Sequence, residues 1–293
     1  METDIDELSS HLSTLKTTSN EIAMLENRQP ISTFILPSMS SCPMATDNYK
    51  HLLIYHHQTL ILFSLPKFDI IFSIPITPSI ESSISDICFH SILNCFLLSS
   101  SNSLYSLSSN RQIEIVHKFS NIIWSITHTS KYIFICYLFG FSIEQWEFNT
   151  NSGTLVNTWF KDSLIESLDI GINCIRAVNQ HLGMTVKENN FSWRIDIFDI
   201  LTMNKIRRGK TIQQENDFKN WIGILYPIDP YQWLFADGDQ GLYLIDQTDE
   251  QEYKQNNIKK IACNICLIHD TNSKTYSSIV VQSYEALHLY DLH

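Results

Sequence analysis

The stretch Ile195-Asp196-Ile197-Phe198-Asp199-Ile200 alternates apolar with other side chains and has an aromatic residue followed by an acid near its end. Alternation with a period of two is typical of a β-strand that buries one face. The same six-residue pattern recurs at 60–65, 102–107, 143–148, 242–247 and 287–292. Counted between residues 63, 105, 146, 198, 245 and 290, the copies are 42, 41, 52, 47 and 45 residues apart.

A repeat of roughly 40–50 residues built from short strands is typical of a β-propeller. We therefore expect an all-β fold with six blades, each with strands a to d from the centre outward and the repeated pattern as strand c. A seven-bladed or incomplete ring stays open. The fifth repeat predicts strands at 221–226, 233–236, 242–245 and 257–261.

The closure of the ring involves residues 31–36, which have the pattern of a strand but no obvious place in the first blade. The sixth repeat has three strands between 262 and 292 and lacks an outer one. Because a closed ring protects strand edges, we expect 31–36 to supply strand d of the last blade. Alternatively, 31–36 is strand a of the first blade, since 38–46 contains Pro43 and three serines and reads as a poor strand.

The N-terminal region, residues 1–28, has a helical period and precedes a propeller over 31–293. Its apolar positions follow a heptad seam of about three heptads, formed by Ile5, Leu8, Leu12, Leu15 and Ile22. Two interpretations are equally favoured: a single amphipathic helix packed on the propeller, or a coiled coil that makes a homodimer.

Composition restricts the partners and the compartment. The net charge of −11 disfavours nucleic acid, which needs a basic field. The N-terminus METDIDEL has no apolar secretory segment, and the longest nearly uncharged apolar stretch, 132–143, is too short to cross a membrane as a helix. Seven cysteines within mostly apolar runs suit reduced thiols. We expect a cytoplasmic protein, with the nucleus left open, and no membrane partner.

The end of strand c carries a family resemblance. An aromatic residue is followed by an acid in Trp146-Glu147, Phe198-Asp199 and Tyr290-Asp291. In the fifth copy, Ile245-Asp246, isoleucine replaces the aromatic residue. They resemble the Trp-Asp that closes a WD40 repeat, and the resemblance implies a propeller that binds other proteins. The Gly-His that opens a WD40 repeat is absent, so its hydrogen-bonded network is not expected. NHL, kelch and quinoprotein-like propellers stay open, and a helix ahead of a propeller is similar to the order in tripartite-motif proteins.

The short motifs that could bind a metal or carry a reaction are better explained by structural roles. Cys263 and Cys266 form a CxxC, but positions i and i+3 of a strand point to opposite faces. Asp237-Gly238 suits a tight turn better than a calcium loop. No nucleophile, phosphate or dinucleotide motif is present. We expect no cofactor and no metal.

One alternative is enzymatic. Asp86, Asn220 and Asn264 fall where strands a approach the central channel, and lactonase-like propellers bind a divalent cation with such oxygens. A metal-dependent hydrolase would require the three to converge on one point.

We expect a non-enzymatic scaffold that binds proteins or peptides. Loops on a rigid framework carry binding, and an acidic chain favours a basic partner. The longest connections, 161–169 and 213–220, together with Trp159 and Phe160, mark the expected contact region. A propeller that selects substrates for a ubiquitin-ligase-type assembly is a further alternative.

Overall fold

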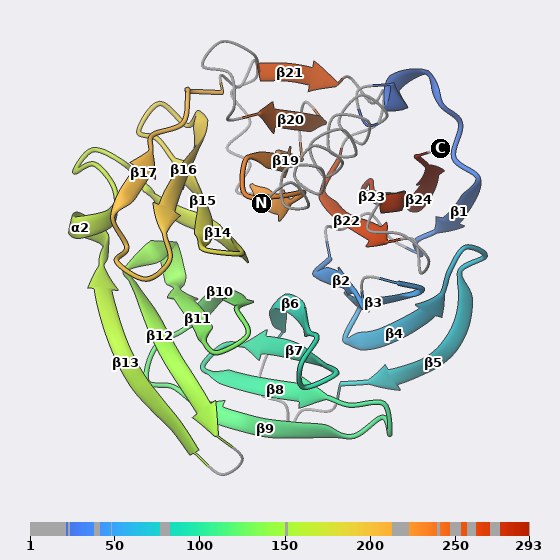
Figure 1. The fold of residues 1–293 in the computed structure, drawn as a ribbon. Coiled ribbons are helices and arrows are strands. Elements are labelled where there is room, and N and C mark those ends of the chain that lie inside the picture. Colours follow the sequence, from blue (N-terminus) through green and yellow to red (C-terminus); the bar gives the residue numbers. More distant parts are fainter. Residues whose placement is uncertain are drawn as a thin grey trace, which may run out of the picture.

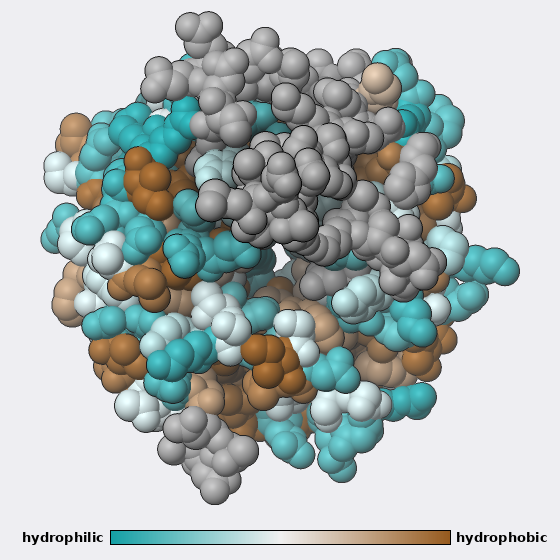
Figure 2. Space-filling view, in the orientation of Figure 1, coloured by the Kyte–Doolittle hydropathy of each residue, from teal (hydrophilic) through white to brown (hydrophobic). Residues whose placement is uncertain are grey.

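Six antiparallel sheets of four strands are arranged in a ring around a central opening (Figures 1 and 2). The architecture is taken from a computed structural model, which describes residues 22, 24–37, 42–47, 49–76, 83–149, 152–212, 223–238, 241–246, 253–256, 262–269 and 276–292. The prediction of an all-β, six-bladed propeller is confirmed within these residues.

Each blade contributes its innermost strand first. Blade 1 contains β2 Met44–Thr46, β3 His51–His56, β4 Thr59–Ser64 and β5 Asp69–Pro75. Blade 2 contains β6 Ile84–His90, β7 Cys95–Ser100, β8 Ser103–Leu107 and β9 Ile113–Lys118. Blade 3 contains β10 Ile123–His128, β11 Ile133–Tyr137, β12 Ser142–Asn149 and β13 Ser152–Phe160.

The other three blades follow the same order. Blade 4 contains β14 Gly171–Val178, β15 His181–Lys187, β16 Trp193–Asp199 and β17 Lys205–Arg207. Blade 5 contains β18 Ile224–Pro227, β19 Gln232–Ala236, β20 Leu242–Asp246 and β21 Tyr253–Asn256. Blade 6 contains β22 Asn264–His269, β23 Tyr276–Gln282, β24 Ala286–Asp291 and, as its outer strand, β1 Ser32–Ile35.

Antiparallel order gives the ring two distinct faces. The turns from strand a to b and from c to d lie on one of them, which we call the a–b face. The turns from b to c and the connections from d to the next a lie on the opposite one, the b–c face. Among the described residues, short helices outside the strands include η1 Leu25–Asn27, η2 Leu138–Gly140 and α2 Lys161–Leu164.

The ring closes as the sequence predicts, with the N-terminal strand completing the last blade (Figure 1). Strand β1 pairs with β24, in a register that sets Ser32 against Leu289. The Ile31 amide extends the pairing by donating to the Leu289 carbonyl at 2.8 Å. Strand a of blade 1 therefore comes from residues 38–46, whose sequence predicts a poor strand. It consists of only the three buried residues Met44–Thr46.

The outer strand of blade 5 corrects the sequence prediction of 257–261. The structure places β21 at Tyr253–Asn256, where Tyr253 pairs with Ile245 and Asn256 with Leu242. An outermost strand needs hydrogen bonds to its neighbour but little apolar surface, so the polar run YKQN meets the requirement. Residues 257–261 lie outside the described part of the chain.

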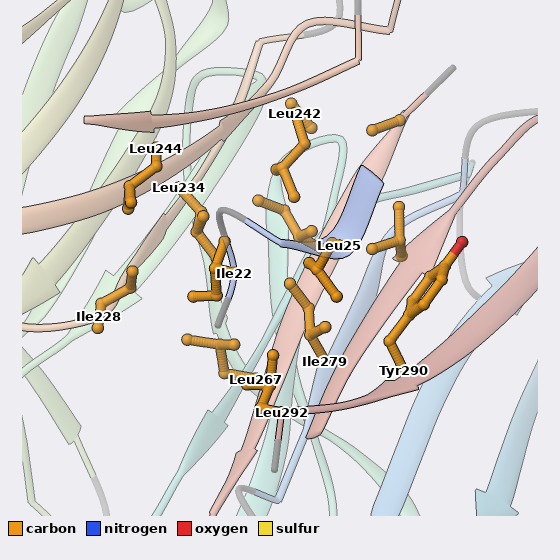
Figure 3. Packing of buried hydrophobic residues seen from close by; sticks show 14 residues of the cluster. Ile22, Leu25, Ile228, Leu234, Leu242, Leu244, Leu267, Ile279, Tyr290 and Leu292 are labelled. Carbon is orange, nitrogen blue, oxygen red and sulfur yellow. The ribbon is translucent and has the colours of Figure 1, made fainter. Parts of the chain in front are cut away.

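The described end of the N-terminal region packs on the propeller itself. Ile22 and Leu25 are buried between blades 5 and 6, beside Leu234, Leu267 and Ile279 (Figure 3). The side chain of Ile22 therefore covers the chain's own apolar surface. The other heptad residues predicted to mediate oligomerisation lie outside the described residues: Ile5, Leu8, Leu12 and Leu15.

Replacing Ile22 with Ala should lower the free energy of unfolding by about 2–4 kcal/mol, because a fully buried branched side chain is lost and a cavity remains. Urea unfolding measures it. Ile31→Ala is the matched control: Ile31 is 56% exposed, and the change should cost less than about 0.5 kcal/mol. Unchanged stability in I22A, with a dimer converted to a monomer in light scattering, would contradict the packing role.

Candidate interaction surface

Exposed apolar side chains gather on the b–c face of blades 3 and 4. We call Ile122, Phe139, Phe141 and Phe160 the aromatic patch; each side chain is between 45% and 61% exposed. The rings of Phe141 and Phe160 meet edge to face, with centroids 6.3 Å apart. Exposed aromatic side chains concentrated in one place on a soluble protein mark an interaction site more often than single exposed residues do.

The inner half of the patch is set by the turn between β11 and β12. Leu138 donates its amide to the Ile122 carbonyl at 2.9 Å, which joins the turn to the preceding connection. Phe139 adopts a φ of 56°, a left-handed conformation that is uncommon for an aromatic residue. Its carbonyl lies against Gly171, where a Cβ atom would come within 2.4 Å of that oxygen. Glycine at 171 therefore permits the close approach that holds Phe139 in place.

The outer half of the patch is Phe160, the last residue of β13, where the connection to β14 begins. The Lys161 amide donates to the Phe141 carbonyl at 3.1 Å, so the start of α2 is fixed beside the β11–β12 turn. Leu164 and Ile165 are buried against the apolar core of blades 3 and 4, whereas Leu168 of the same connection is 73% exposed. The connection from β13 to β14 is therefore held against this core beside the patch.

A buried ion cluster anchors the same connection to blade 4. Arg194 is fully buried, and its guanidinium donates to Asp169 at 2.7 Å, to Glu188 at 3.2 Å and to Asp196 at 3.0 Å. Lys205 adds a second cation to Asp196 at 2.9 Å. Buried charges persist only when paired and hydrogen-bonded, and every member named here is.

The cluster extends to the surface through Arg208. Its guanidinium donates to Glu166 at 2.6 Å and to Glu188 at 3.3 Å. Glu166 and Asp169 belong to the connection from β13 to β14, which begins directly after Phe160, while Arg194 and Arg208 belong to blade 4. The ion pairs therefore hold this connection against blade 4.

The pKa values follow from these contacts. Burial opposes ionisation of Asp169, but the hydrogen bonds and charge of Arg194 outweigh it and hold the pKa of this carboxyl below its usual value. For Glu188, burial is likewise outweighed, here by hydrogen bonds from Ser192, Thr211 and Arg194, and the pKa is lowered. Burial works against the charge of Arg194, yet the two aspartates raise the pKa of its guanidinium.

The predicted contact residues lie at this surface with different exposures. Phe160 is 57% exposed and belongs to the patch. Trp159 is partly buried and packs against the core of blades 3 and 4. The connection 213–220 lies outside the described residues. Phe139 and Phe141 were missed, although an apolar run where a turn must lie is a signal for them.

The central channel contains an ion pair that crosses three blades. Both oxygens of Asp86 in β6 accept from the guanidinium of Arg176 in β14, each at 2.8 Å. In β10, between them, the Ser125 hydroxyl donates to Asp86 at 2.7 Å and the Ile126 amide at 3.0 Å. Asp86, expected as a metal ligand in the enzymatic alternative, is thus paired with a cation of the chain itself.

Of the other two expected ligands, the structure describes Asn264, whose side-chain amide is hydrogen-bonded to the backbone. Asn264 accepts from the Ile265 amide at 2.8 Å and donates to the Cys42 carbonyl at 3.0 Å. Asn220 lies outside the described residues. Beside Arg176 the channel widens into a cavity of about 240 Å³ that Asn264 also lines.

The CxxC cysteines are buried thiols. Burial raises the pKa of Cys263 and of Cys266 to about 12, so neither forms a thiolate readily. In the described part of the chain, no group of three or more His, Cys, Asp or Glu side chains is placed to hold a metal ion. No helix among the described residues is long and apolar enough to span a membrane.

With the geometry in place, the chain can be compared with known proteins. The WD40 domain of Neurospora crassa Pan2 is similar in structure, with a TM-score of 0.53 at 11% sequence identity, over 90% of this chain and 82% of that domain. The fold is therefore that of a WD40-like β-propeller. Comparisons with protein families and with curated proteins find no match.

Proposed function

We propose that this propeller is a protein-binding scaffold and that the aromatic patch is its main contact surface. The observation that carries the proposal is the exposure of Phe139, Phe141 and Phe160 on a turn and a strand end that backbone hydrogen bonds join, beside a connection that the Arg194 cluster anchors. A surface already ordered in the free protein loses little entropy on binding, and aromatic side chains dominate the binding energy of many interfaces.

The chemistry of the partner follows from the patch and its border. Apolar side chains of the partner would cover the rings, and exposed Asp162 in α2 would face a basic residue beside them. Lys161 would not compete with the basic residue for Asp162, because the Lys161 ammonium already donates to the carbonyls of Asp169 and Ile170 at 2.9 and 2.7 Å. The net charge of −11 would also speed the approach of a basic protein.

Serine at both Phe141 and Phe160 should reduce recovery of the bound partner at least tenfold, because two central aromatic contacts are lost. The measurement is quantitative affinity purification from cells that express the tagged full chain, followed by titration of the purified partner. Tyr231→Ser serves as the matched control, because Tyr231 is an aromatic residue of 51% exposure in blade 5.

Equal recovery by the F141S/F160S chain, the Tyr231→Ser chain and the native chain would overturn the role of the patch. Circular dichroism of each variant shows whether the fold is kept. Because both rings are largely in solvent, their replacement should leave the unfolding midpoint almost unchanged.

A further inference from the structure

A second cavity lies between blades 1 and 2 and opens on the a–b face, opposite the aromatic patch. Its volume is about 310 Å³, at the lower end of the range of about 300–1,000 Å³ for ligand sites. It is bordered by the outer strands of blade 1 and by two turns of blade 2, the β6–β7 turn and the β8–β9 turn. This position is separate from the central channel.

The floor of the cavity is apolar and aromatic. Phe72 from β5 and Phe96 from β7 line it from the two blades, and Leu107 closes it from β8. The ring of Phe96 is itself supported by Phe89, with centroids 5.0 Å apart. Such a floor accepts one aromatic or branched aliphatic side chain of a ligand.

The border of the cavity holds one open positive charge. The guanidinium of Arg111 lies 5.5 Å from the centroid of the Phe72 ring, and no carboxylate in the described part of the chain pairs with it. Arg111 has a φ of 67°, and its amide donates to the Ser108 carbonyl at 3.0 Å, so the turn places this residue at the edge of the cavity. Asn94 and Ser109 line the same border with polar groups able to bond a peptide backbone.

The acidic group at the opposite edge is already satisfied. One oxygen of Asp47 accepts the amides of Tyr49, Lys50 and His51 at 2.9–3.0 Å. Its other oxygen meets the His51 ring nitrogen at 2.6 Å. Its capacity to attract a cation is thereby reduced, whereas Arg111 retains donors for an anion.

We propose that this cavity binds a peptide of a partner protein through an apolar side chain in the pocket and an adjacent carboxylate on Arg111. Arginine presents two parallel donors to a carboxylate and discriminates it from a neutral amide. The carboxylate comes from an acidic side chain or from a chain terminus. The site does not depend on the aromatic patch, so either can fail alone.

Three small peptides test the proposal on the full chain by ligand-observed NMR titration. They are acetyl-Phe-Asp-amide, its neutral counterpart acetyl-Phe-Asn-amide, and acetyl-Phe-Gly with a free terminal carboxylate. We expect one or both of the acidic peptides to bind at least fivefold more tightly than acetyl-Phe-Asn-amide, and the tighter one identifies the source of the carboxylate. Arg111→Gln should weaken that peptide about tenfold, since a charge-assisted contact is lost.

Two further variants sharpen the result. Lys118→Gln removes one exposed positive charge on the b–c face and should leave the affinity unchanged. Ser109→Trp should abolish binding by covering the mouth without altering charge. The proposal is overturned if neither acidic peptide binds at 5 mM, roughly the weak limit of such contacts. Equal affinities for the Asp and Asn peptides, with R111Q unchanged, overturn it as well.

Discussion

Replacing Arg194 with Met should lower the free energy of unfolding by about 4–5 kcal/mol, the largest effect we expect for a single substitution. Removing one member of a buried ion pair costs about 3–5 kcal/mol, because the partner stays buried without its counter-charge. Arg194 serves Asp169, Glu188 and Asp196 at once and is fully buried, which places the cost at the upper end. Urea unfolding at pH 7 measures it.

Arg208→Met is the matched control within the same cluster. Arg208 is also paired with two glutamates, but its side chain is 45% exposed. Exposed ion pairs contribute at most about 1 kcal/mol to stability, so R208M should lower the free energy of unfolding only slightly. Equal costs for R194M and R208M would contradict the argument from burial.

The pH dependence of the Arg194 variant gives an independent test. In the native chain the folded-state pKa values of Asp169 and Glu188 are lowered, so their contribution is present above the unfolded values near 4 and is lost as pH falls through the folded values. Without Arg194, the carboxyls are favoured in the protonated form. The stability difference between R194M and the native chain should therefore narrow between pH 7 and pH 4. A constant difference would contradict this account.

Replacing Arg176 with Met should lower the free energy of unfolding by about 3 kcal/mol, because Asp86 would remain in the channel with hydroxyl and amide donors but no cation. The effect should be smaller than that of R194M, since Asp86 has one cationic partner and Ser125 and Ile126 still donate to it.

A double-mutant cycle isolates this pair. Asp86→Asn should be destabilising alone, and the combination with Arg176→Met should cost less than the two single changes together by about 2 kcal/mol. Additive costs would show that the two side chains do not depend on each other for stability. Unfolding in urea supplies all four corners of the cycle.

The sequence predicts the fold well where local pattern decides it. The repeated pattern of strand c is local, and in every blade the predicted copy coincides with a strand in the structure. The sequence pattern predicts 257–261 instead of β21, because an outermost strand such as Tyr253–Asn256 needs no apolar pattern. Strand β2 is only Met44–Thr46, so three buried residues after Pro43 left too short a signal.

The candidate sites are only partly visible in sequence, because they depend on pairs distant along the chain. Phe160 was predicted from its place beside a long connection, which is local information. The pairing of Asp86 with Arg176 joins residues 90 positions apart, and no spacing rule links them. An acid at a channel position consequently suggested a metal ligand, although the structure gives it an arginine.

The closure of the ring has a consequence for the order of events during synthesis. Residues 32–35 of β1 leave the ribosome early, but their partners in β24, at 286–289, are made about 250 residues later. At about 5–20 residues per second, this delay is roughly 12–50 s. Blades 1 to 5 can pair their strands as they emerge, whereas blade 6 must wait while its outer strand is exposed. A chaperone that shields unpaired strands would therefore act on residues 32–35 until β24 is complete.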